Sequence, residues 1–138
     1  MPGKLQEDIA VTAYVVPLVF QATNIPDAAG TANGVEPTTP DYIMPWAGSV
    51  IGVSISLNAN PTTGVITARP VVNGTGSTAV TAVVQNNTQR NTGQKPAGTL
   101  NFAAGSRIGA DWTKSGTVAP TTMDATIIIW VLLNPVAV

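Results

Sequence analysis

The chain has 138 residues and a formal net charge of −1; only 9% of its residues are charged, and it contains neither cysteine nor histidine. A chain of this length suits one domain that buries a core of its own. The two missing residue types exclude disulfides, thiol catalysis, histidine-dependent nucleophile triads and the usual zinc sites, so we expect no catalytic residue, no cofactor and no metal site.

The few charges are unevenly distributed along the chain. Typical soluble domains carry about 25% charged residues, so the low value here favours a surface that is largely covered in an assembly. Residues 1–41 contain one base and five acids, which gives −4, and the remainder contains five bases and two acids, which gives +3. The acidic leading segment is therefore suited to lie on a neighbour's basic body. The five bases are scattered and the pI is about 5.0, so no nucleic-acid partner is expected.

Residues 1–41 predict one strand followed by an extended acidic arm or long loop. The strand is expected over residues 9–20, where apolar residues recur, with a bend or a sheet edge at Pro17. Residues 24–40 are rich in proline and glycine and have no apolar periodicity, which is typical of a segment that contacts another subunit. The candidate contacts with a capsid or a neighbour are Asp27, Glu36, Pro37, Pro40 and Asp41. A secretory signal is not expected, because Glu7 and Asp8 stand where positive charge belongs.

Residues 42–138 predict the body of the domain. Strands are expected at residues 42–46, 49–57, 65–72, 78–85, 99–102, 107–113 and 124–133. Pro70 confines its strand to an edge or a bulge, and residues 58–64 and 86–98 are predicted to be a turn and a solvated loop. Asn73-Gly74 is a hairpin dipeptide, although the residues after it favour a longer loop. Counting the strand at 9–20, the sequence predicts an all-β fold: an antiparallel β-sandwich, specifically a jelly roll of about eight strands.

The closing strand at 124–133 is apolar on both faces. One face carries Thr126, Ile128, Trp130 and Leu132, and the other carries Ile127, Ile129, Val131 and Leu133. One face can cover the core, and we expect the other to be covered by another copy of the chain. The candidate oligomer-interface residues are Ile127, Ile129, Trp130, Val131 and Leu133. The run is shorter than a membrane-spanning helix requires, so no membrane is expected as a partner.

The tryptophans and acids of the body allow more than one interpretation. Trp46, Trp112 and Trp130 can fill the core, form a subunit interface or offer a stacking surface for a sugar. The only body acids, Asp111 and Asp124, fit turn and strand-end positions better than the carboxylate pair of a glycosidase. A calcium site formed by Asn58, Asn60 or Asp111 is conceivable, but the chain has no Asp-rich calcium loop.

Four stretches resemble a family of virion proteins. They are Met44-Pro-Trp-Ala-Gly-Ser-Val-Ile-Gly-Val-Ser-Ile-Ser-Leu, Pro70-Val-Val-Asn-Gly, Leu100-Asn-Phe-Ala-Ala-Gly-Ser-Arg-Ile-Gly-Ala-Asp-Trp and the closing apolar strand. Together they resemble the small jelly-roll modules of tailed bacteriophages, which include capsid decoration (auxiliary) proteins and domains of head or tail fibres. Many such modules have Gly-Asp where this chain has Gly105-Ser106. The resemblance implies a homotrimer, and the acidic arm is most similar to that of a decoration protein.

The sequence therefore suggests a non-enzymatic structural protein of a virion. In this hypothesis a trimeric decoration or cement protein, made in the host cytoplasm, binds the major capsid protein at the outer capsid surface and stabilises the shell. The alternative is a trimeric fibre or receptor-binding module that recognises a cell-surface glycan.

Overall fold

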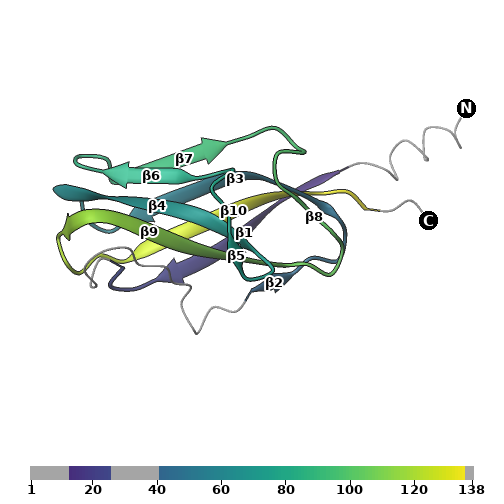
Figure 1. Ribbon diagram of the computed structural model, residues 1–138, viewed down its shortest axis with the longest axis horizontal. Coiled ribbons are helices and arrows are strands. Elements are labelled where there is room, and N and C mark those ends of the chain that lie inside the picture. Colours follow the sequence, from purple (N-terminus) through teal and green to yellow (C-terminus); the bar gives the residue numbers. More distant parts are fainter. Residues whose placement is uncertain (1–12, 26–40, 136–138) are drawn as a thin grey trace, which may run out of the picture.

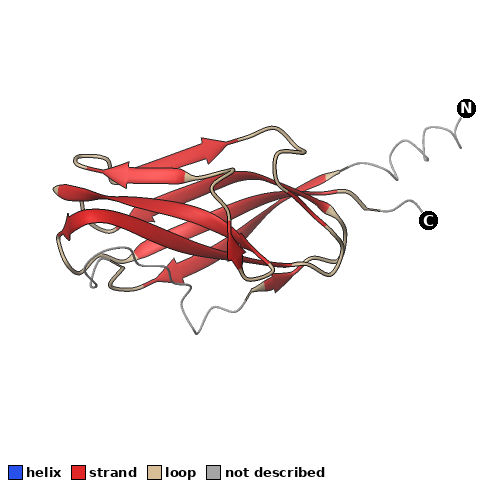
Figure 2. Cartoon of the chain, viewed as in Figure 1, coloured by secondary structure: helices blue, strands red, loops and turns tan. Residues whose placement is uncertain are grey.

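The protein is a sandwich of two antiparallel β-sheets (Figures 1 and 2). The computed structural model describes residues 13–25 and 41–135. These residues form ten strands, and none of them forms a helix that could cross a bilayer. The all-β prediction is confirmed.

The first sheet, here called sheet A, has the strand order β1-β10-β3-β7, with β8 beside β3. Its members are β1 (Tyr14–Ala22), β3 (Gly48–Leu57), β7 (Arg90–Gln94), β8 (Asn101–Phe102) and β10 (Ala125–Leu133). β1 pairs with β10 along its whole length, from Tyr14 opposite Leu133 to Ala22 opposite Ala125. The start of β1 and the end of β10 therefore lie at the same end of the sandwich.

The second sheet, sheet B, has the order β2-β9-β4-β5, with β6 also paired to β4. Its members are β2 (Tyr42–Ile43), β4 (Thr63–Val72), β5 (Thr75–Gly76), β6 (Ala82–Gln85) and β9 (Arg107–Ala119). When β5 and β8, two of the three two-residue strands, are set aside, eight strands remain. Numbered along the chain, they are ordered 1-8-3-6 in sheet A and 2-7-4-5 in sheet B. This interleaving of two Greek keys is the topology of a jelly roll.

The core lies between the sheets, and its largest fully buried side chains are isoleucine and valine apart from Met123. In β10 every second side chain is buried, and Ile129 and Val131 are fully enclosed. Sheet B supplies Ile66, Ile108 and Trp112 from its inner face. Such packing of two inner faces is what holds a sandwich together. Among the described residues, no buried side-chain nitrogen or oxygen lacks a hydrogen-bond partner.

β1 forms a free edge of sheet A, and that edge is partly blocked. The carbonyl of Val19 accepts a hydrogen bond from the Tyr42 hydroxyl at 3.2 Å, so the polar groups of Val19 are directed away from β10. Alternate residues of a strand share this direction, and the missing N–H of Pro17 therefore falls on the free side, where it costs no ladder bond. The expectation that Pro17 marks a sheet edge is confirmed.

A β-bulge in β3 changes the face on which its residues lie. Trp130 pairs with Gly52, but the next residue, Val131, pairs with Val50, so Ile51 is the extra residue. Regular alternation along residues 49–57 would place Ile51 with Val53 and Ile55 in the core. In the structure Val50 takes that place with 0% exposure, and Ile51 turns toward the outer face of sheet A.

Several predicted boundaries are wrong. Residues 86–98 were predicted to be a solvated loop, but they contain β7. The sequence does not reveal this strand, because both its faces are polar and it has no hydrophobic period. The strand at 107–113 continues to Ala119, and residues 78–81 precede β6 instead of belonging to it.

The turn at Asn73-Gly74 is shorter than the loop that the sequence favours. It is a two-residue hairpin that pairs Val72 with Thr75, and both turn residues have positive φ. Residues 9–12 of the first predicted strand lie outside the described residues.

The prediction that Pro70 lies at a sheet edge or a bulge is also wrong. β4 is an interior strand, paired on one side with β9 through Ala110 opposite Pro70. On its other side, β4 pairs with β6 at residues 65–68 and with β5 at residues 71–72. Pro70 occupies the gap between these two ladders, where no strand requires its N–H.

Candidate functional site

A groove runs along the outer face of sheet A. It consists of three hollows of about 860, 490 and 360 Å³ that share lining residues and therefore join end to end. Ser54 and Thr92 line both the first and the second hollow, and Ser56, Arg90 and Thr126 line both the second and the third. The groove follows β3, between β10 and β7.

The groove arises from a difference in side-chain size between neighbouring strands. The floor is Gly52, Ser54 and Ser56 of β3, all small residues. On one side stands the outer row of β10, defined here as Ile128, Trp130 and Leu132, and on the other stand the long polar side chains of β7. Register places these residues directly opposite one another: Ser54 lies between Ile128 and Thr92, and Ser56 between Thr126 and Arg90. A strand of small residues between two strands of large residues leaves a trough.

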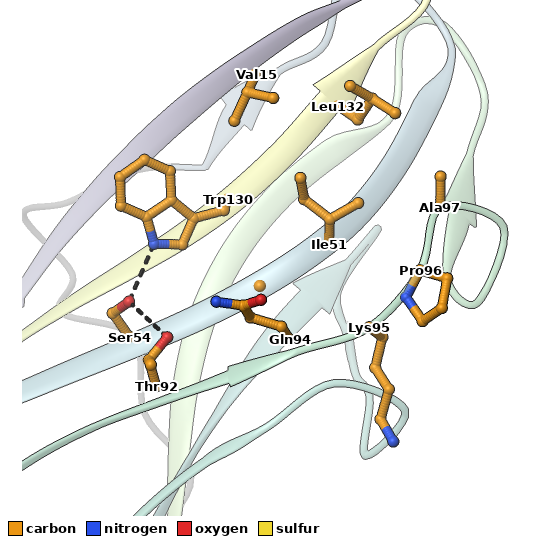
Figure 3. Close-up of a pocket in the computed structure, with 11 residues that line it drawn as sticks. Val15, Ile51, Ser54, Thr92, Gln94, Lys95, Pro96, Ala97, Trp130 and Leu132 are labelled. Atoms are coloured by element: carbon orange, nitrogen blue, oxygen red, sulfur yellow. Dashed lines mark hydrogen bonds between the residues drawn. The ribbon is translucent and has the colours of Figure 1, made fainter.

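A chain of hydrogen bonds fixes the middle of the groove (Figure 3). The Trp130 indole N–H donates to Ser54 Oγ at 3.0 Å, and Thr92 Oγ1 donates to the carbonyl of Val53 at 3.1 Å. Because Thr92 has only one hydroxyl proton, Ser54 must donate in the 3.1 Å bond between the two hydroxyls. This chain orients the indole ring and leaves its apolar surface as part of the groove.

The end of the groove nearest the start of β1 is closed by the segment at residues 95–97. Figure 3 shows Lys95, Pro96 and Ala97 on one side of the hollow, and Val15, Trp130 and Leu132 on the other. The Lys95 N–H donates to the carbonyl of Ile51, the bulged residue, at 3.0 Å. The Gly98 N–H donates to Ser49 Oγ at 3.0 Å. The β3 bulge thus holds this segment in place.

The groove has one apolar side and one basic side. The outer row of β10 and Val15 supply the apolar side, with Val15 56% exposed. Arg90 stands on the opposite side and donates from Nε to Ser56 Oγ at 3.2 Å, whereas the Lys95 side chain extends away from the hollow in Figure 3. The one acid that lines the groove, Asp124, lies at the far end, where its carboxylate accepts a hydrogen bond from the Asn24 N–H. Such a surface suits an extended ligand with an apolar edge and an acidic edge.

The candidate interface residues of the closing strand fall on two different faces. Ile127, Ile129, Val131 and Leu133 point into the core and are buried within the subunit. Trp130 alone lies on the outer row, as strand alternation requires, and there its indole N–H finds a polar partner in Ser54. An interface formed by the face of β10 can therefore use the outer row, and not the four aliphatic residues.

Of the candidate contacts in the arm, only Asp41 lies among the described residues. Asp27, Glu36, Pro37 and Pro40 lie outside them. Asp41 stands 3.8 Å from Arg107 across sheet B, on the side of the sandwich opposite the groove. Its carboxylate also occupies the space beside Gly109, where a Cβ would meet it.

The three tryptophans have three different environments. Trp112 is buried, and its indole N–H donates to the carbonyl of Ile25 at 3.0 Å, as expected for a core residue. Trp130 forms part of the groove. Trp46 is 38% exposed in the segment after β2. The core interpretation therefore holds for Trp112 and fails for Trp46 and Trp130.

The acids of the body serve structural roles. Asp111 forms a two-point ion pair with Arg69, at 2.8 Å from Nε and 2.6 Å from Nη2. This hydrogen bonding raises the pKa of Arg69 above its ordinary value, with burial partly opposing the effect. Asp124 accepts from Asn24, and its own N–H donates to Asn58 Oδ1 at 3.0 Å. Within residues 13–25 and 41–135 no three His, Cys, Asp or Glu side chains are grouped so as to hold a metal.

Sequence reasoning did not identify Ser54, Thr92, Gln94 and Lys95 as site residues. The available signal was the alternation of small residues in 50–56 beside the polar alternation of Arg90, Thr92 and Gln94. These patterns become a groove only after strand pairing places β7 next to β3.

No protein-family model and no curated protein matches the sequence. Three solved structures show low similarity. A chain in the acidic stable capsid of Helicobacter pylori bacteriophage KHP30 is 12% identical, with 91% of this chain and 99% of that chain covered and a TM-score of 0.45. A chain in the capsid asymmetric unit of cyanophage Pam1 is 16% identical, with 89% and 86% covered and a TM-score of 0.41. A chain in the empty head of turnip yellow mosaic virus is 11% identical, with 89% and 82% covered and a TM-score of 0.35. Similarity this low does not identify a function.

Proposed function

We propose that this chain is a non-enzymatic structural protein of a virion, acting as a homotrimeric decoration or cement protein. The observation that carries the proposal is the groove of sheet A, whose apolar side is built by the outer row of β10 in a chain with only 9% charged residues. Jelly rolls serve in viral capsids, in lectins and in other roles, so the fold alone does not decide the function. An apolar outer face and few charges favour a subunit that is buried in an assembly.

Association of subunits gains free energy from the outer row. Ile128, Trp130 and Leu132 are each half-buried in the single subunit. Complete burial of a large apolar side chain is worth about 1.5–3 kcal/mol, so each of these residues has roughly a third of that or less left to gain from a neighbour. Three such residues from each copy, repeated around a symmetry axis, stabilise a small oligomer without requiring salt bridges.

The trimer then binds the major capsid protein at the outer surface of the shell. Each copy makes a weak contact, and three linked contacts reinforce one another through effective concentration. The virion surface is therefore the proposed location, reached after synthesis in the host cytoplasm.

Light scattering coupled to gel filtration tests the oligomer. The protein is expected to elute as a trimer at micromolar concentration, and Trp130→Ala is expected to shift it toward monomer because the outer row is weakened. Ile43→Ala is the matched control, since Ile43 is a 69% exposed residue of sheet B. A wild-type monomer at this concentration contradicts the proposal.

Co-sedimentation with empty capsids tests the partner. The wild-type protein is expected to pellet with shells assembled from the major capsid protein of the same phage, and to raise the temperature at which those shells open. A trimer that remains in the supernatant contradicts the cement role while leaving the oligomer intact.

A second candidate function is a receptor-binding module that recognises a cell-surface glycan. The observation that favours it is the Trp130 ring in a groove with polar side chains at Thr92 and Gln94, since aromatic surfaces stack on sugars. Trimeric protein that binds a defined class on a glycan array, and loses binding with Trp130→Ala, supports this function in place of the first.

A further inference from the structure

We propose that Asn73 is a deamidation site, and that the fold slows its reaction through the contacts that the side chain makes with Ser106 and Arg107. Asn73 and Gly74 form the turn between β4 and β5, which both belong to sheet B. The chemistry of this turn is therefore independent of the groove in sheet A and of self-association.

An asparagine that is followed by glycine can lose its side-chain amide without any enzyme. The backbone nitrogen of Gly74 attacks Asn73 Cγ, so a nitrogen–carbon bond forms, the Cγ–Nδ2 bond breaks, and the proton of the attacking nitrogen leaves with Nδ2 as ammonia. Water then opens the cyclic imide at either carbonyl and gives aspartate or isoaspartate. Glycine favours the attack because it has no Cβ to obstruct the close approach.

In the folded protein both polar atoms of the Asn73 side chain are bound. Oδ1 accepts a hydrogen bond from the Arg107 N–H at 2.9 Å, and Nδ2 donates to Ser106 Oγ at 3.4 Å. The Asn73 N–H also donates to the carbonyl of Arg107 at 2.8 Å. Attack on Cγ requires the carboxamide to turn its face to the Gly74 nitrogen, and a carboxamide bound at both ends is not free to rotate. These contacts therefore oppose the reaction.

The partners of Asn73 are themselves fixed in the structure. Ser106 is buried, its carbonyl accepts from the Met44 N–H at 2.9 Å, and its N–H donates to the carbonyl of Ala103 at 3.1 Å. Asn73 and Gly74 have the positive φ angles, 51° and 87°, that a tight hairpin turn requires. The turn must therefore open locally before the amide reacts.

The two products are expected to affect the hairpin differently. An aspartate at position 73 keeps an oxygen for the Arg107 N–H, and the Ser106 hydroxyl can donate to the other oxygen instead of accepting. Isoaspartate carries the backbone through its side chain and lengthens the turn, so the pairing of Val72 with Thr75 is expected to be lost. Gly76 of β5 lies against the Arg69–Asp111 ion pair, and release of β5 would expose that pair to water.

Mass spectrometry of the full-length protein, digested after incubation at mildly alkaline pH, tests the inference. The rate at residue 73 is compared between the native protein and the same protein unfolded in guanidinium chloride. The native rate is expected to be lower by about tenfold or more, because only the open fraction of the turn reacts. The digestion separates residue 73 from Asn33, the other asparagine that is followed by glycine.

Ser106→Ala tests the contact to Nδ2. Loss of one neutral hydrogen bond is expected to raise the native rate at residue 73 by roughly two- to tenfold. Ser49→Ala is the matched control, because Ser49 is the other buried serine of the described residues and its hydroxyl binds Asn101 and the Gly98 N–H instead. This control is expected to leave the rate at residue 73 unchanged, and in guanidinium chloride all three proteins should react equally.

Three results would overturn the inference. Equal rates in the native and the unfolded wild type mean that the fold gives no protection. An unreacted Asn73 in the unfolded chain means that the dipeptide is not a deamidation site. A native rate that Ser106→Ala does not raise, or that Ser49→Ala raises as much, means that the contact with Ser106 does not slow the reaction. The comparison of native and unfolded wild type needs no variant, so it decides the matter even if Ser106→Ala does not fold.

Discussion

At the scale of single residues, four of the few charged side chains form two ion pairs that differ in geometry. Arg69 and Asp111 face each other on the outer face of sheet B, and their side chains are 17% and 9% exposed. Two parallel hydrogen bonds join them. Arg107 and Asp41 lie on the same sheet but are 3.8 Å apart, and the Arg107 side chain is 55% exposed. The chain thus offers a tight, largely buried ion pair and a loose, more exposed one beside the same sheet.

Arg69→Ala is expected to lower the free energy of unfolding by about 2 kcal/mol, because it leaves the Asp111 carboxylate poorly hydrated and without its partner. Arg69→Lys keeps the charge but loses the two-point geometry, so its loss is expected to be intermediate. Arg107→Ala is the control and should change stability by less than about 0.5 kcal/mol. Urea unfolding of the three variants measures this order, and equal losses for Arg69→Ala and Arg107→Ala would contradict it.

At the scale of elements, β10 performs two functions with alternate side chains. Its inner residues complete the core and its outer row forms one side of the groove. Adjacent isoleucines, Ile128 and Ile129, belong to different faces and so provide a matched pair.

Ile129→Ala removes a fully buried side chain and is expected to cost about 2–5 kcal/mol of subunit stability. Ile128→Ala, on the half-buried outer row, is expected to cost about 1 kcal/mol or less in the subunit but to weaken self-association. Urea unfolding at protein concentrations below assembly, together with light scattering above it, separates the two effects. A larger stability loss for Ile128→Ala than for Ile129→Ala would show that the faces are assigned wrongly.

The elements also show how far sequence patterns reach. Strands with an apolar period, such as β3 and β10, were predicted to within one residue at each end. β7 was missed because a polar edge strand has the composition of a loop. The predicted count of eight strands included the two-residue β8 and omitted β7, which holds the sixth position of the jelly roll. The groove depends on pairing between β3 and β7, and on a bulge at Ile51, neither of which a local pattern encodes.

At the scale of the whole molecule, stability and assembly are expected to be linked. The chain has no disulfide, and its groove leaves apolar side chains half-buried in the single subunit. Burial against other copies then contributes to the stability of the folded state by mass action.

The melting temperature is therefore expected to rise with protein concentration. Diluting the protein about a hundredfold should remove roughly 2 to 3 kcal/mol of this stabilisation and lower the Tm by several degrees. Differential scanning fluorimetry over a concentration series measures the dependence, with Trp130→Ala as a comparison whose Tm should vary less. A Tm that is independent of concentration would mean that the subunit is stable without its neighbours.

The blocked edge of β1 determines which kinds of assembly are open to this protein. A sheet that ends in a free strand can recruit further strands without limit, and the products are fibres. Here Pro17 offers no donor to an incoming strand and Tyr42 already occupies the Val19 carbonyl. Growth by adding strands to β1 is thereby hindered, which favours contacts between copies through side chains on the faces of the sheets. Face contacts can close around a symmetry axis and stop at a fixed number, so the protein can be produced at high concentration without polymerising along this edge.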